Sequence, residues 1–235
     1  MRVTKFGTLY QLSFMPRFFP VNCYLVEENK ELTLIDAALP FSTKGILRAA
    51  NKLKKPITNI VLTHAHTDHV GALDALKAAL PHVKISISER DARLLAGDNS
   101  LLEHEAGTSI PGGAPKNIKS KPDRLLKEGD RIGSLEVIFT PGHTPGSLSL
   151  LDLRNDYLIA GDALQTRGGI AVSGTLKPLF PFPALATWNK EAALESTKKL
   201  QSFSPRLLAV GHGKMIQQPE KALVKAVKAS ERNLR

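Results

Sequence analysis

The sequence predicts an α/β protein, a four-layer αββα sandwich made of two similar halves. One order of elements, namely hairpin, aspartate, helix, strand and histidine, occurs twice along the 235 residues. The composition, 42% hydrophobic and 23% charged, is that of an ordinary globular protein with enough apolar residues for a core. Both copies end their strands at histidine or aspartate, as two halves facing one site would. Residues 1–235 are therefore expected to form a single domain.

The first half begins with a predicted β-hairpin at residues 22–39, NCYLVEENKELTLIDAAL. Two apolar runs separated by about five polar residues are typical of a hairpin. A helix is predicted over residues 42–55 and a buried strand over residues 58–66, TNIVLTHAH. Asp36 follows the hairpin, and His64 ends the later strand.

The second half repeats this order. Residues 147–164, SLSLLDLRNDYLIAGDAL, predict the second hairpin, and Asp162 follows it. A helix is predicted over residues 189–203, and a strand that ends at His212 comes after it. This copy is longer, mainly through the Gly- and Pro-rich insertion at residues 165–187, which predicts a functional loop or a disordered one.

The stretch THAHTDHVG, residues 63–71, contains three histidines and an aspartate that could bind metal ions. His64 and His66 are two apart on an extended segment, so both side chains can point at one ion. Asp68 and His69 fall on the first turn of the predicted helix that follows and can hold a second ion. Imidazole and carboxylate together suit zinc, and also iron or manganese. Two divalent ions are expected, with Zn²⁺ first and iron or manganese as alternatives.

Three further ligand candidates follow predicted strands: His143, in VIFTPGHTPGS, and the Asp162 and His212 already placed. The two other histidines, His82 and His104, follow no strand and are expected on the surface.

The order THAHTDH, TPGHTPGS, GDA and GH resembles the metallo-β-lactamase-fold hydrolases over nearly the whole chain. The resemblance implies the same αββα sandwich. It implies one metal on His64, His66 and His143, and a second on Asp68, His69 and His212. Asp162 would bridge the two ions, and Asp36 would orient the ligands by a hydrogen bond.

Such a site can activate water. Two divalent ions lower the pKa of bound water towards about 7, which gives a metal-bound hydroxide as the nucleophile. Asp68 is the expected catalytic residue, pointing toward the incoming water. The expected reaction is cleavage of an ester, thioester or lactone of a small, partly apolar molecule. Cys23 is expected to pack in the core.

The loops around the site would select the substrate. Candidates for binding its apolar part are aromatic, and packing onto the core explains these side chains equally well. They are Phe18, Phe19, Phe180, Phe182 and Trp188. Gln165 stands where acyl-homoserine lactonases of this fold carry a tyrosine, and it could donate a hydrogen bond to substrate.

Two other activities share the motif: a metal-dependent nuclease or phosphodiesterase of the ribonuclease Z type, and a mononuclear-iron sulfur dioxygenase. The net charge of +10 would suit nucleic acid, but the basic residues are spread along the chain and form no arm. A small-molecule substrate is expected, with no nucleic acid and no membrane partner, and a homodimer is left open. The single cysteine and the lack of a long apolar run predict a cytoplasmic protein.

Overall fold

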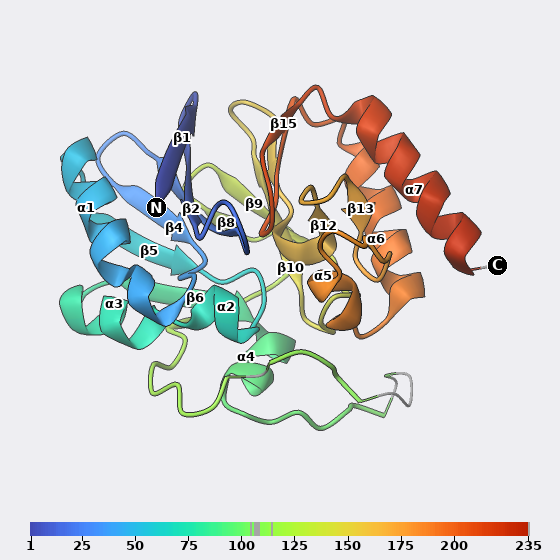
Figure 1. Ribbon diagram of the computed structural model, residues 1–235. Helices are drawn as coiled ribbons and strands as arrows, with labels where there is room; N and C mark the ends of the chain where they lie inside the picture. The colour runs from blue at the N-terminus through green and yellow to red at the C-terminus, as the bar shows by residue number, and fades with distance from the viewer. Residues whose placement is uncertain (104, 106–108, 114, 235) are drawn as a thin grey trace.

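The computed structural model describes residues 1–103, 105, 109–113 and 115–234, and it confirms the predicted four-layer αββα sandwich. Two sheets lie face to face in the middle of the molecule (Figure 1). Helices α1 (Thr43–Leu53) and α3 (Leu73–Ala79) cover the outer side of one sheet. Helices α6 (Lys190–Ser202) and α7 (Glu220–Leu234) cover the outer side of the other.

The first sheet has seven strands in sequence order. Strands β3 and β4 form the predicted hairpin, and β5 pairs with β4 in parallel after α1. The two strands before them, β1 and β2, were not predicted, because buried polar Gln11 and Ser13 interrupt the apolar pattern of β2. The strands are β1 (Arg2–Phe6), β2 (Leu9–Phe14), β3 (Val21–Glu27), β4 (Leu32–Ile35), β5 (Ile57–Val61), β6 (Lys84–Ser88) and β7 (Arg124–Leu126).

The second sheet has six strands in the order β15-β14-β11-β10-β9-β8. Strands β10 and β11 form the second predicted hairpin, and β14 pairs with β11 in parallel after α6. The repeat seen in the sequence is therefore a repeat of structure. The strands are β8 (Arg131–Ile132), β9 (Leu135–Phe139), β10 (Leu148–Asp152), β11 (Tyr157–Ile159), β14 (Leu207–Ala209) and β15 (Ile216–Gln217).

Three apolar clusters hold the four layers together. One lies between the sheets and contains Ile35, Val61, Val137 and Leu150, all buried. The other two lie between each sheet and its helices. Each fully buried aliphatic side chain contributes about 1.5–3 kcal/mol to the free energy of folding. Packing thus fixes the strand ends, from which the polar side chains project.

The remaining helices and strands follow those strand ends in the chain. Helix α2 (Thr67–Val70) follows β5, and α4 (Glu89–Leu95) follows β6. The insertion contains two short paired strands, β12 (Leu164–Gln165) and β13 (Ala171–Val172), and helix α5 (Phe182–Leu185). Among the described residues, none of the helices combines the length and the apolar character needed to cross a membrane.

Candidate metal centre

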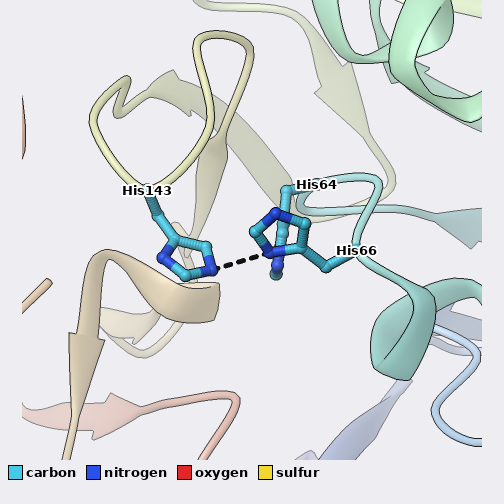
Figure 2. Close-up of side chains that lie close together, drawn as sticks. All are labelled: His64, His66 and His143. Carbon is cyan, nitrogen blue, oxygen red and sulfur yellow. Dashed lines mark hydrogen bonds between the residues drawn. The ribbon is translucent and has the colours of Figure 1, made fainter. Parts of the chain in front are cut away.

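Three histidines from two loops converge at the strand ends (Figure 2). His64 and His66 lie between β5 and α2, and His143 lies between β9 and β10. Nδ1 of His66 lies 2.9 Å from Nε2 of His143. One ring nitrogen from each residue falls within 4.8 Å of the other two. The first predicted ligand set is therefore assembled in space.

Two more ligand sets overlap the first. One consists of His64, His69 and Asp162, and the other of Asp68, His69 and His212, each with ligand atoms within 4.8 Å. Asp162 lies between them: its Oδ1 is 3.5 Å from Nε2 of His69, and its Oδ2 is 3.1 Å from Nε2 of His212. The structure thus brings all seven predicted ligands into one continuous cluster.

The donor atoms of this cluster fit a metal ion. Among the described residues, Nε2 of His64 is buried without a hydrogen-bond partner, and the buried Nε2 of His69 and Oδ1 of Asp162 lie 3.5 Å apart as an ion pair without a hydrogen bond. Leaving such a group unpaired costs about 1–3 kcal/mol each. Imidazole nitrogens and a carboxylate oxygen are ligands that zinc and iron accept. Divalent ions would satisfy all three atoms together.

The charges divide the cluster into two parts. Burial lowers the pKa of His64 well below its usual value and that of His143 to about 3, so both rings are neutral. Burial also opposes the charge on His212, but the Asp162 carboxylate outweighs it and raises the His212 pKa to about 10. Burial would raise the pKa of Asp68, yet His69 and His212 hold it below its usual range. Metal binding would displace protons from the second part.

Carboxylate and carbonyl oxygens form hydrogen bonds with two of the candidate histidine ligands. Asp36, with a left-handed φ of 61°, lies 2.8 Å from Nδ1 of His69 and accepts hydrogen bonds from Thr63. A carboxylate on one ring nitrogen fixes the tautomer, which directs Nε2 of His69 into the cluster. Nδ1 of His212 lies 2.7 Å from the carbonyl oxygen of Pro20.

The first half of the chain also holds the His212 loop in place. The side-chain amide of Asn22 donates to the carbonyl oxygens of Val210 and Gly213, at 2.8 Å in both cases. The hydroxyl of Tyr24 donates to the carbonyl of Val210 at 2.7 Å and accepts from its N–H at 3.0 Å. Gln11 donates to the carbonyl of Gly213 at 2.9 Å. We call these contacts the inter-half seam.

Asp91 is another supporting residue that the sequence did not reveal. Asp91 is fully buried at the start of α4 and accepts hydrogen bonds from the N–H of Ala65, the N–H of Gly146 and the hydroxyl of Thr144, at 2.8–2.9 Å. It therefore ties the loop of His64 and His66 to the loop of His143. Its only local signal is the helix cap formed by Ser88, which says nothing about the loops.

The loop between α4 and β7 also reaches the cluster. The carbonyl oxygen of Pro111 lies 3.2 Å from Nε2 of His66. Gly112 has a φ of 94°, and a Cβ there would overlap the ring of His66. The sequence analysis did not predict this contact. The visible signal was the Pro-Gly-Gly run at residues 111–113.

A cavity of about 300 Å³ opens onto the cluster. The side chains of His66, Asp68 and His212 form part of its wall, and apolar residues form most of the rest. The apolar lining residues are Phe19, Leu39, Phe182, Pro183 and Ala186. The cavity is thus shaped for a ligand with an apolar part next to a polar group.

The predicted substrate residues fall into two groups. Phe19 and Phe182 line the cavity and contact each other, with ring centroids 5.0 Å apart. Phe180, 1% exposed, packs against both rings without lining the cavity. Phe18 is 81% exposed and is not part of the lining.

Gln165 and Trp188 are not among the residues that line the cavity. Gln165 is buried and donates to the carbonyl of Phe180 at 3.3 Å. The backbone N–H of Trp188 donates to the carbonyl of His143 at 3.0 Å. Direct substrate contact by these two residues stays a prediction. His82 is exposed, as predicted, and His104 lies outside the described residues.

Comparison with known proteins gives a consistent picture. A family model described as the metallo-beta-lactamase superfamily matches residues 16–212. The uncharacterized protein YobT of Bacillus subtilis is 58% identical over 232 residues, covering 99% of this chain and 100% of that protein. An acyl-coenzyme A thioesterase of Gallus gallus is 33% identical over 167 residues, covering 61% of this chain and 57% of that one.

A solved structure has the same architecture. A protein in a di-iron-bound form is 29% identical, with a TM-score of 0.66, covering 90% of this chain and 96% of that one.

Proposed function

Since the chain belongs to the metallo-β-lactamase superfamily, we propose that it is a hydrolase that uses two divalent metal ions to cleave an ester, thioester or lactone. One observation carries this proposal: the ligand sets overlap, and Asp162 lies between them with one oxygen toward His69 and the other toward His212. Seven ligands exceed what a single tetrahedral ion needs. Zinc is the first expectation for both ions, and the di-iron-bound relative keeps iron as the alternative.

One ion would be held by His64, His66 and His143, and the other by Asp68, His69 and His212. Asp162 would be a ligand of both ions. When bound, the ions would supply Lewis acidity and lower the pKa of water so that a nucleophile exists at neutral pH.

The protein supplies orientation and proton handling. The Asp68 side chain is 26% exposed and lines the cavity, so its carboxylate can accept a proton from the incoming water. Its Oδ2 lies 3.4 Å from Nε2 of His212. Asp36 holds the ring of His69, and Pro20 holds the ring of His212. Phe19 and Phe182 would exclude water from one wall and bind the apolar part of the substrate.

Among the three bond types, a thioester is favoured. The relative from Gallus gallus is named as an acyl-coenzyme A thioesterase, and an acyl chain would match the apolar wall. We also propose that the substrate is a small molecule and that the protein acts in the cytoplasm.

Metal analysis followed by a substrate screen tests the proposal. Fully loaded protein is expected to contain two ions per chain and to hydrolyse thioesters or lactones in a metal-dependent way. The screen would include lactones, thioesters, β-lactams and bis-p-nitrophenyl phosphate. One iron per chain with oxidation of a persulfide would favour the dioxygenase, and cleavage of the phosphodiester alone would favour the nuclease.

A further inference from the structure

A second hollow region lies beside the metal centre, and none of the seven candidate ligands lines it. It consists of two cavities of about 330 and 530 Å³ that share Arg2, Lys214 and Met215 in their walls. We call it the basic groove. Besides the shared residues, its cationic and apolar walls include Lys5, Phe6, Arg167 and Leu207.

The charged side chains that line the basic groove are all cationic. Arg2, Lys5, Arg167 and Lys214 line it, and no aspartate or glutamate is among the described lining residues. The carboxylate that acts on Lys5, that of Glu27, is already bound by other groups. Some cations outside the groove are paired, as Arg154 is with Asp152 at 2.8 Å. Four cations in a lining whose described residues include no carboxylate raise the local potential for anions.

The floor of the groove is apolar. Leu207 is buried, and Phe6 and Met215 are partly buried. The ring of Phe6 packs edge-on against Tyr157, with centroids 5.3 Å apart, so its position is fixed. An apolar floor inside a cationic rim matches a nucleoside phosphate, whose base can stack while its phosphates contact Arg and Lys.

Hydrogen bonds hold the side chain of Arg167 and the backbone of Lys214. The guanidinium of Arg167 donates to the carbonyl of Arg17 at 2.7 Å, which fixes its direction and leaves other N–H groups for an anion. The hydroxyl of Thr166 donates to the carbonyl of Lys214 at 2.7 Å. Arg167 and Lys214 thus belong to two loops that follow strands and are joined by a hydrogen bond.

The basic groove and the metal cavity share a wall. Within residues 15–20, Phe19 lines the metal cavity, while Pro16 and Pro20 line the groove. His212 faces the metal cavity, and the next residues, Gly213 and Lys214, line the groove. A ligand that occupies both must therefore have two ends joined by a thin arm that crosses this wall. Coenzyme A thioesters have that shape, with an acyl thioester at one end and an adenosine bisphosphate at the other.

We propose that the basic groove binds the adenosine bisphosphate end of an acyl-coenzyme A thioester whose acyl end lies against Phe19 and Phe182 at the metal centre. This inference rests on the proposed function and names the substrate class for the same site. The cations bind the phosphates and the apolar floor takes the base. The groove contributes to substrate affinity and not to the chemical step.

Binding of adenosine 3′,5′-bisphosphate, measured by calorimetry on the metal-loaded protein, tests the groove alone. The test variant is K5E/K214E, in which both changed residues are exposed. The matched control is K44E/K52E, which makes the same charge change on the exposed side of α1. We expect K5E/K214E to raise the Kd at least tenfold and K44E/K52E to change it less than twofold. No binding by the wild type, or an equal loss in both variants, would overturn the proposal.

Kinetics on two thioesters of one fatty acid separate this proposal from the proposed function. For the coenzyme A thioester, K5E/K214E should raise KM about tenfold and leave kcat unchanged, because uniform binding is lost. For the N-acetylcysteamine thioester, which lacks the nucleotide, neither constant should change.

If the wild type hydrolyses the short thioester but binds no bisphosphate, the groove assignment fails and the hydrolase stands. If it binds the bisphosphate at the groove and hydrolyses no ester, thioester or lactone, the proposed function fails. A short RNA that binds more tightly than the bisphosphate, with the same loss in K5E/K214E, would reassign the groove to nucleic acid and overturn the proposal.

Discussion

The carbonyl oxygen of Pro111 lies 3.2 Å from Nε2 of His66, so a loop far away in the sequence orients a candidate metal ligand. If Nε2 donates its proton to this carbonyl, the lone pair is on Nδ1. That nitrogen is the one that lies 2.9 Å from Nε2 of His143, inside the cluster. The loop therefore selects the tautomer of His66 that can bind a metal.

Gly112→Ala should weaken binding of the metal held by His66. The added Cβ would overlap the His66 ring, so the loop must move and the contact with Pro111 is lost. Loss of such a supporting hydrogen bond lowers metal affinity by about 10- to 100-fold. Gly97→Ala is the control, since Gly97 has a similar φ of 88° and nothing lies within 4 Å of its Cβ position. Competition with a chelating dye would measure both, and equal affinities would contradict this role for the loop.

Asp68→Asn should abolish most activity without unfolding the protein. The side chain is partly exposed and faces the cavity, so the core does not depend on it. We expect kcat to fall at least about 100-fold, as for loss of a general base, while the circular dichroism spectrum stays native. Asp156→Asn, at an exposed position in the β10–β11 turn, is the control. Wild-type turnover by the Asp68 variant would rule out a catalytic role.

Phe182→Ala should weaken binding of long acyl substrates. Phe182 lines the metal cavity, so its loss removes apolar contact made in both ground and transition states. We expect KM to rise about tenfold for a long-chain substrate and hardly at all for an acetyl one. Phe18→Ala, outside the cavity lining, should change neither. If Phe182 only packs the fold, the melting temperature will fall and both substrates will lose equally.

Asp91→Asn should change the way stability depends on pH. Burial raises the pKa of Asp91 to about 6, despite the hydrogen bonds it accepts. The folded state then holds a proton that the unfolded state has already lost, so ionisation costs the folded protein stability between about pH 4 and 6. At 1.36 kcal/mol per pKa unit, the advantage of the wild type over the variant should shrink by roughly 3 kcal/mol across that range. Denaturant unfolding of both metal-free proteins at several pH values measures this, and parallel curves would contradict it.

The sequence predicted the parts of the fold that follow local patterns. Two hairpins, and in each half a helix followed by a strand, were expected from apolar runs and turn residues, and the structure has them in both halves. The ligand positions could also be predicted, because His64 to His69 are close in sequence and the other ligands lie in the segments that follow strands.

The rest depends on contacts between distant segments. Asp91 acts by accepting backbone N–H groups of Ala65 and Gly146, and nothing in its own neighbourhood indicates those partners. Strand β2 escaped prediction because Gln11 is buried, and it is buried because Tyr24 and Gly213 bond to it. The sequence around such residues shows no hydrophobic periodicity that reveals their role, because their partners come close only when the two sheets pack together.

The inter-half seam has a consequence for how this protein could be divided. Asn22 and Tyr24 satisfy the backbone of Val210 and Gly213, next to His212, with side chains from the other half of the chain. A polypeptide cut between the halves would leave those backbone groups without partners and the seven ligands on two separate pieces. Neither fragment would bind the metal pair alone, and the two would regain it only as a reconstituted complex, so metal uptake could report on their reassembly.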